Sequence, residues 1–350
     1  MPSVRARVRK AQVEATRAVV RWYVENYYLK AGDPGVPSMF FDAGTVGHFA
    51  IERARFAAGD AGALFRLLIA TTMFQRRQDQ QILRILRSMP ERTARELTDL
   101  RILLRLADRS SCVHLRTTDA LRESCDLQKD PDTKLGCCQV APSTPCHLKV
   151  HTVVLRRYGH FGKVPTSVAL AVRESGAGDL GALHEAVLRT YEEPTARAAA
   201  LEAALCRAWR VNQKIASMFL SAVTNPDLSP RTPPWGTGID WRRFVVVDSN
   251  VDLFLASIGY RGGSSYDARS AFVRDISRRI DLASIDSRLS SDNPRIVQQA
   301  MYLFMSVANR RAALSDCMHA GAGACRQCDS KLRARCPVGT PYSQVGAAAD

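Results

Sequence analysis

The segment that decides our interpretation of the fold is Trp209-Arg210-Val211-Asn212-Gln213-Lys214-Ile215-Ala216-Ser217-Met218-Phe219-Leu220. Its first half is polar and its second half is apolar, which predicts a turn between two helices with Lys214 in the first turn of the second. A helix start offers unpaired backbone N–H groups and the positive end of the helix dipole, and both suit a phosphate. Partial burial there would lower the pKa of the Lys214 amine towards neutrality and make it a usable nucleophile. The alternative is an ordinary solvated lysine at a helix start.

Apolar residues recur at three- and four-residue spacing through most of the chain, which predicts an all-α protein. We expect helices over Val13–Tyr28, Leu64–Phe74, Ile82–Met89, Leu97–Leu106, Val150–Tyr158, Leu180–Leu188, Ala198–Trp209 and Ile296–Val307. The one β-like run of note, Phe244–Val247, is too short for a sheet of its own. It leads into Asp248, which is a good N-cap residue for the helical segment that follows. A carboxylate in that position is also well placed to stabilise a developing positive charge.

Four of the ten cysteines crowd into the last tenth of the chain, with the spacing C-x(7)-C-x(2)-C-x(7)-C. They are Cys317, Cys325, Cys328 and Cys336. Four thiolates this close in sequence can surround one metal centre, and a central C-x-x-C serves both iron–sulfur clusters and zinc. The alternative is four free thiols in a flexible tail. The irregular region 108–147 holds five further cysteines, but their spacings match no metal motif.

The composition is that of a globular protein with a strong basic surplus. Hydrophobic residues make up 46% and charged residues 24% of the 350 residues, which excludes a disordered chain. The net charge of +15 favours a polyanionic partner, most commonly nucleic acid, although a GC-rich genome would also enrich arginine. No apolar run is long enough to span a bilayer, and the N-terminus has no signal-peptide segment. We therefore expect a cytoplasmic, nucleoid-associated protein with no membrane partner.

Taken in order, these segments resemble the helix-hairpin-helix DNA glycosylase superfamily, which contains endonuclease III and the 8-oxoguanine glycosylases. The run Asn212–Ala216 is similar to the hairpin whose lysine attacks the sugar, and Val247–Val251 is similar to the strand-end aspartate motif. The four C-terminal cysteines stand in the place of the iron–sulfur loop of the endonuclease III branch. The resemblance covers about residues 60–336, discontinuously.

Two upstream segments add to the resemblance. Leu67–Ala70 with Gln75–Asp79 resembles the opening helices of the catalytic domain, where a glutamine fills the gap left by the extruded base. Gly162–Pro165 is similar to a recurrent G-x-V-P segment before the hairpin. The order of these motifs carries the resemblance, since each motif alone is short.

The chain departs from the family pattern at three points. It has no glycine between Gly181 and Gly236, but Asn212 can adopt a left-handed turn, so a hairpin remains feasible. Lys214 and Asp248 lie 34 positions apart, more than in endonuclease III, and we expect the Pro- and Gly-rich segment 225–243 to be a looped-out insertion. The cysteine spacing is also wider, which leaves zinc open beside iron–sulfur.

The resemblance implies a two-lobed helix-hairpin-helix DNA glycosylase fold with an interlobe cleft and a C-terminal metal-cluster loop. The implied organisation is an N-terminal helical segment packing with the C-terminal lobe (1–60), a catalytic lobe (61–224) with its insertion (108–147), a second insertion (225–243), a C-terminal lobe (244–316), a four-cysteine loop (317–336) and a tail (337–350).

The implied function is a bifunctional DNA glycosylase and AP lyase for damaged, mainly oxidised, bases. Lys214 would attack C1′ of a flipped nucleotide, Asp248 would stabilise the positive charge, and β-elimination would nick the strand. The cysteines would hold a 4Fe-4S cluster, with zinc as the alternative, and the protein would act on double-stranded DNA as a monomer. The implied DNA contacts are Gln75, Arg76, Arg210, Asn212 and Gln213.

Two other functions stay open from the sequence. The same chemistry could serve as a base-excision defence against modified foreign DNA. A protein of a different class, a non-catalytic metal-stapled DNA-binding protein, would use Lys214 only to contact phosphate.

Overall fold

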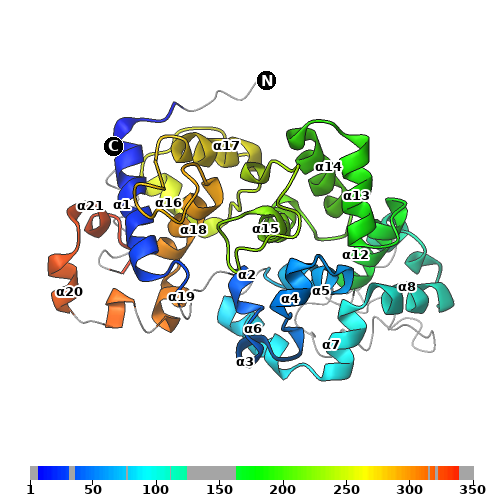
Figure 1. The fold of residues 1–350 in the computed structure, drawn as a ribbon. Coiled ribbons are helices and arrows are strands. Elements are labelled where there is room, and N and C mark those ends of the chain that lie inside the picture. Colours follow the sequence, from blue (N-terminus) through cyan, green and yellow to red (C-terminus); the bar gives the residue numbers. More distant parts are fainter. Residues whose placement is uncertain are drawn as a thin grey trace, which may run out of the picture. The chain divides into compact units, whose positions relative to one another are not determined.

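The computed structural model describes residues 7–30, 36–75, 78–110, 112–123, 163–313, 316–319 and 322–338. Within these residues every regular element is a helix, which confirms the predicted all-α class. None of the described helices is long and apolar enough to cross a membrane. The chain divides into two compact units (Figure 1). Unit 1 comprises Met1–Met39, Asn225–Arg231 and Trp241–Asp350, and unit 2 comprises Phe40–Thr224 and Thr232–Asp240.

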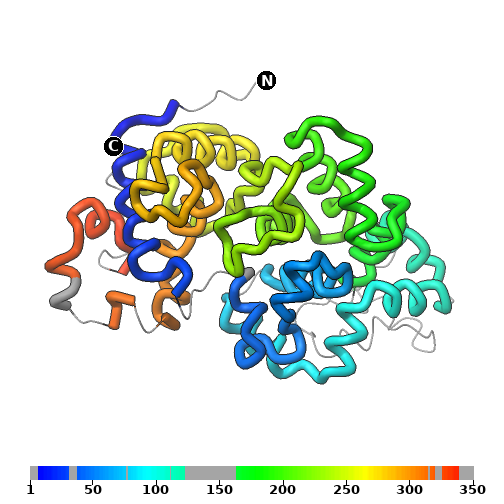
Figure 2. Tube along the Cα trace, viewed as in Figure 1, coloured from blue at the N-terminus to red at the C-terminus, as the bar shows by residue number. Residues whose placement is uncertain are grey.

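Unit 1 is built around α18 (Pro294–Met305), in which nearly every side chain is buried. Asn293 starts this helix as its N-cap, since its side-chain oxygen accepts from the backbone N–H groups of Arg295 and Ile296 at 3.1 and 3.2 Å. Helix α1 (Lys10–Asn26) packs against α18, and Figure 2 shows the two tubes side by side. The N-terminal helix therefore shares one core with the C-terminal part of the chain.

The other helices of unit 1 are α2 (Val36–Met39), α16 (Ser249–Ser257), α17 (Tyr266–Ser277), α19 (Val307–Ala312), α20 (Ala322–Gln327) and α21 (Ser330–Arg333), with short 3₁₀ turns η4 (Trp241–Arg243) and η5 (Cys317–His319). Both α16 and α17 pack against α18.

Unit 2 has α15 (Gln213–Thr224) at its centre. Every residue from Ile215 to Thr224 is buried, and the helix packs against α5 (Ala61–Thr72) and α14 (Pro194–Cys206). The remaining helices are α3 (Ala43–Val46), α4 (Arg53–Ala57), α6 (Asp79–Ser88), α7 (Glu91–Thr98), α8 (Leu100–Arg109), α9 (Thr118–Glu123), α12 (Lys163–Glu174) and α13 (Leu180–Thr190), with 3₁₀ turns η1 (Gly47–Phe49) and η2 (Val113–Leu115).

Three aspartates fix where the helices of unit 2 begin. The side chains of Asp60, Asp99 and Asp179 accept hydrogen bonds of 2.7 to 2.9 Å from backbone N–H groups in the first turns of α5, α8 and α13. An aspartate at this position satisfies an orphan backbone donor and complements the helix dipole.

Most of the predicted helices are confirmed, with boundaries within a few residues. One was wrong in its extent: Leu97–Leu106 is two helices, because Asp99 ends α7 and caps α8. The predicted helix Val150–Tyr158 lies outside the described residues. The confirmed helices are α1, α5, α6, α13, α14 and α18.

The short run Phe244–Val247 is buried, but it forms no strand with any described residue. Its backbone is held instead by Tyr266, whose hydroxyl donates to the Val245 carbonyl at 2.6 Å. The run therefore works as a buried extended connection rather than as a β-strand.

The segment 225–243 is not looped out, so that prediction was wrong. Asn225 exchanges side-chain hydrogen bonds of 3.0 and 3.1 Å with Asn293 in unit 1, where Leu228 is also buried. Trp235 is buried in unit 2, and its backbone N–H donates to the Val223 carbonyl at 2.8 Å. The prolines and glycines mark turns between these attachment points.

Unit 2 begins at Phe40 rather than at residue 61. The Phe40 ring is fully buried and packs edge-on against Phe74, with ring centroids 5.8 Å apart. Its carbonyl accepts from the Ile51 N–H at 2.8 Å. Because these aromatic contacts lie within unit 2, the segment after Met39 belongs to that unit and only the preceding residues belong with the C-terminal part.

Candidate functional site

The turn between α14 and α15 is made by an arginine in the left-handed region. Arg210 has a φ of 63°, whereas Asn212 acts as the N-cap of α15. The Asn212 side-chain oxygen accepts from the Ile215 N–H at 3.2 Å, and its carbonyl accepts from the Ala216 N–H at 2.9 Å. The left-handed residue of the turn is therefore Arg210, whereas the short amide of Asn212, which also tolerates that conformation, serves as the cap.

Trp209 fixes the turn from the side of α12. Its backbone N–H donates to the Ser167 hydroxyl at 2.6 Å. Two cations face its ring, with Lys163 Nζ 4.5 Å and Arg210 Cζ 5.0 Å from the ring centroid. The position of Arg210 is therefore supported by a cation–π contact.

A hollow of about 410 Å³ opens in unit 2 at the start of α15. We call it the Lys214 hollow, and it brings Lys214 together with three of the predicted DNA contacts, Gln75, Arg210 and Asn212. Gln213 does not line it, and Arg76 lies outside the described residues. The full lining is Gln75, Arg122, Cys206, Ala208, Arg210, Val211, Asn212, Lys214 and Ile215.

The charges around the Lys214 hollow are all positive. Lys214 is half-buried, while Arg122 and Arg210 are exposed, and no carboxylate is among the residues that line the hollow. Burial raises the pKa of the Cys206 thiol to about 11, so this thiol stays neutral at physiological pH. Such a hollow attracts an anion and offers it one primary amine.

Asp248 in unit 1 is the N-cap of α16, as the sequence predicted. Its Oδ1 accepts from the backbone N–H groups of Asn250 and Val251 at 3.1 and 3.0 Å. Beneath it, Arg295 is only 3% exposed, and burial lowers the pKa of that guanidinium. The negative charge of Asp248 is among those that raise the pKa of Arg295 again.

Two of the four C-terminal cysteines lie against the side chain of Arg310 in unit 1. Arg310 on α19 donates to Cys317 Sγ at 3.2 Å and to Cys336 Sγ at 3.5 Å. Burial raises the pKa of the Cys328 thiol, and the nearby thiols of Cys336 and Cys325 raise it further. The donor set is chemically that of a soft metal, but within the described residues no three Cys, His, Asp or Glu side chains are grouped to hold one.

Arg310 ties this cysteine loop to α1. Its side chain is 1% exposed and pairs with Asp316 at 2.9 Å, and Asp316 also accepts from the Tyr27 hydroxyl. The guanidinium lies 4.9 Å from the Trp22 ring centroid. Sequence reasoning missed Arg310 because its neighbours, Asn309 and Arg311, make it look like part of a solvated helix end.

Sequence reasoning also missed Arg122 in the Lys214 hollow. It lies on α9, within the region 108–147 that was interpreted as irregular, and its guanidinium donates to the Arg207 carbonyl at the α14–α15 turn. No periodic pattern marks so short a helix. The cysteines at 125, 137, 138 and 146 lie outside the described residues.

No family model, no curated protein and no solved structure matches the chain. The resemblance to the helix-hairpin-helix glycosylases therefore rests on the order of its short motifs.

Proposed function

We propose that this chain is a bifunctional DNA glycosylase and AP lyase of the helix-hairpin-helix kind, acting on damaged bases in double-stranded DNA. One observation carries the proposal: Lys214 stands half-buried in the first turn of the buried helix α15, in a hollow whose charged lining is wholly cationic. A primary amine fixed beside a phosphate-attracting surface is what lysine attack on a sugar needs.

The pair α14 and α15 would act as the hairpin that holds the DNA backbone. The first N–H groups of α15 point out of the helix start, and Arg210 and Arg122 add charge beside them. In this proposal Arg210, in the left-handed conformation, replaces the glycine that the family usually places in the turn.

The chemistry would run in two steps from Lys214. The unprotonated amine attacks C1′ of the flipped nucleotide, the C1′–N bond breaks, and the base leaves with the electron pair and takes up a proton. Asp248 stabilises the positive charge that develops at the sugar. Loss of an amine proton and cleavage of the C1′–O4′ bond, with a proton taken up by O4′, then open the sugar and give a protonated Schiff base. Removal of a C2′ proton from this species breaks the C3′–O bond, and the 3′ phosphate leaves with that electron pair.

The cysteine loop would hold the metal centre. Cys317, Cys325, Cys328 and Cys336 would bind a 4Fe-4S cluster, with zinc as the alternative, and the centre would supply a structural cross-link. Arg310 would donate N–H groups to two of the ligand sulfurs, as it does to the thiols here.

A panel of single-lesion duplexes, incubated with and without borohydride, tests the proposal. We expect base release, strand nicking and a borohydride-trapped covalent complex on at least one oxidised base. Activity confined to bases that are modified only in foreign DNA would favour the defence enzyme. DNA binding without base release or trapping on any lesion or abasic site would contradict the proposal.

A second candidate is the non-catalytic, metal-stapled DNA-binding protein. The observation that favours it is the cap of α16, which accounts for Asp248 without any catalytic role. It predicts duplex binding that depends on Lys214 and Arg210 but no covalent adduct. Analysis of anaerobically purified protein for iron, acid-labile sulfide and zinc decides the metal separately from the catalytic question.

A further inference from the structure

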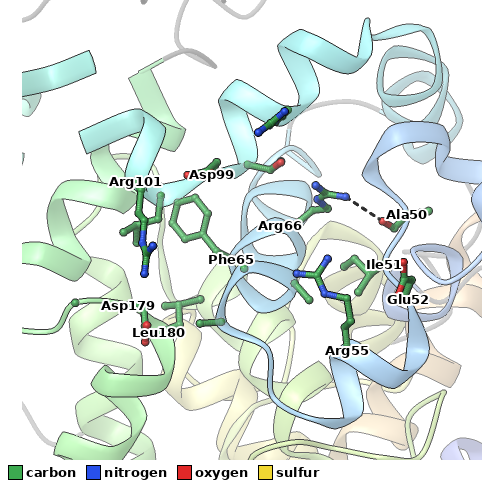
Figure 3. Close-up of a pocket in the computed structure, with 17 residues that line it drawn as sticks. Ala50, Ile51, Glu52, Arg55, Phe65, Arg66, Asp99, Arg101, Asp179 and Leu180 are labelled. Atoms are coloured by element: carbon green, nitrogen blue, oxygen red, sulfur yellow. Dashed lines mark hydrogen bonds between the residues drawn. The ribbon is translucent and has the colours of Figure 1, made fainter. Parts of the chain in front are cut away.

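Unit 2 contains a second cavity, which is distinct from the Lys214 hollow. It has a volume of about 400 Å³, and four arginines line it: Arg55, Arg66, Arg95 and Arg101. We call it the arginine pocket. Figure 3 shows the guanidinium groups of Arg55 and Arg66 to one side of Phe65 and that of Arg101 to the other.

Arg66 is more buried than the other three arginines of the pocket, which are exposed. It is half-buried, and its NH1 group reaches only the carbonyls of His48 and Ala50, both at 3.5 Å. Burial lowers the pKa of the Arg66 guanidinium, and the charge of Arg55 lowers it further. A guanidinium with five donors in this position gains from an anionic acceptor inside the pocket.

The carboxylates that line the pocket are largely occupied. Asp99 and Asp179 each accept the backbone N–H of a helix start, and the lining Arg55 pairs at 2.7 Å with Asp60, which does not line the pocket. Glu52 is the third lining carboxylate, and it is exposed. In contrast, Arg95 and Arg101 form no ion pair within the described residues. The donors of Arg66, Arg95 and Arg101 therefore remain available to a ligand.

Apart from its arginines and carboxylates, the pocket is lined largely by apolar side chains. Ile51, Phe65, Leu100 and Leu180 line it and are otherwise buried. The volume lies within the range of small-molecule sites, which combine an apolar lining with a few convergent polar groups. The ligand therefore needs an anionic group for the arginines and an organic part for these walls.

We propose that the arginine pocket binds a small phosphate-bearing molecule of mononucleotide size. The arginines that line the pocket supply the donors for the phosphate, because guanidinium groups match its oxygens with charge-assisted hydrogen bonds. The organic part lies against Phe65 and Leu180. This site does not use Lys214, so it stands or falls independently of the proposed function.

Calorimetric titration of the full chain tests the site, at constant ionic strength. The probes are inorganic phosphate, a nucleoside monophosphate and the same nucleoside without phosphate. We expect saturable binding of the monophosphate, weaker binding of inorganic phosphate and none of the nucleoside. Arg66→Gln should weaken monophosphate binding about tenfold or more, and so should Arg101→Gln, whose wild-type side chain is exposed.

Arg92→Gln is the matched control, since Arg92 lies on α7 like Arg95 but is 90% exposed, pairs with Glu96 and does not line the pocket. It should leave the affinity unchanged, and circular dichroism should show equal helix content in all variants. Absent binding by the wild-type chain would overturn the site, as would equal losses in Arg92→Gln or equal affinity for the nucleoside. Displacement of the monophosphate by undamaged duplex DNA would assign the pocket to backbone phosphates and also overturn it.

Discussion

Lys214 and Asp248 both stand at helix starts, but they relate differently to the helices that carry them. Asp248 is the cap of α16, and its oxygen accepts two backbone N–H groups. Lys214 caps nothing, because Asn212 fills that role for α15. The fold therefore explains the aspartate by itself, whereas it gives no structural reason for a lysine at the mouth of the Lys214 hollow. Substitutions at the two positions should separate function from stability.

The largest effect is expected at Lys214. Lys214→Gln should abolish the borohydride-trapped complex, because the amide cannot form a Schiff base. The melting temperature should stay unchanged, since the side chain makes no cap, and duplex affinity should fall less than about tenfold. Gel analysis of trapped complexes and thermal unfolding measure the two sides of this expectation.

Lys10→Gln is the matched control for this substitution. Lys10 is also a lysine in the first turn of a helix, α1, and it is exposed. The Lys10→Gln variant should show the same borohydride trapping and the same melting temperature as the wild type. Trapping that survives in Lys214→Gln would remove Lys214 from the mechanism.

Asp248 should show both a catalytic and a structural effect, which two variants separate. Asp248→Asn keeps a good N-cap but removes the charge, so we expect base release about a hundredfold slower with little change in stability. Asp248→Ala also loses the cap and should cost about 1 kcal/mol of unfolding free energy. Single-turnover rates and denaturant titrations of both variants give the comparison. A normal base-release rate in Asp248→Asn would leave the aspartate with its cap role alone.

Asn212 provides the complementary test on the other helix start. Asn212→Ala removes the side-chain acceptor for the Ile215 N–H and should cost about 1 kcal/mol, while trapping persists. Urea unfolding and the trapping assay report on each. If Asn212→Ala instead eliminated trapping at unchanged stability, Asn212 would take part in the reaction. The distinction between a structural cap at Asn212 and a nucleophile at Lys214 would then be wrong.

The sequence predicted the elements of the fold better than their connections. Periodic segments such as Leu64–Phe74 formed helices because their apolar faces are buried whatever their partners are. The proline-rich segment 225–243 was wrongly predicted to be looped out. Its buried residues Trp235 and Leu228 are isolated in the sequence, so no apolar periodicity shows that they are buried. Which residue takes the left-handed turn, Arg210 or Asn212, depends on the cation–π contact to Trp209 and on the cap, and neither is visible in a local pattern.

The residues of the candidate site also fall into those that the sequence could place and those that it could not. Lys214, Arg210 and Asn212 could be placed together from the sequence because they are adjacent in it. Gln75 reaches the same hollow from a distant helix end, and its place there followed only from the resemblance. Arg122 and the arginine pocket had no signal, since these arginines lie on separate helices and look like solvated surface charge in the sequence.

The smallest effect is expected at the other end of α15, where Trp235 bonds to Val223 and stacks on His184 with ring centroids 4.6 Å apart. Burial lowers the pKa of His184 below its usual value, and its buried Nε2 has no hydrogen-bond partner within the described residues. The unfolded chain therefore binds a proton at this residue more readily than the folded chain does. Stability from this group is present above about pH 6.5 and is lost as the pH falls below it.

His184→Phe keeps a ring against Trp235 but cannot titrate. Its unfolding free energy should fall less steeply than that of the wild type between about pH 6.5 and pH 5, by at most the one-proton slope of about 1.4 kcal/mol per pH unit. Urea unfolding at several pH values measures this difference, and identical slopes would show that His184 is solvated in the folded state. Since this contact holds the C-terminal end of α15 while Asn212 holds its start, the pH slope tests whether the helix that carries Lys214 is fixed at both ends.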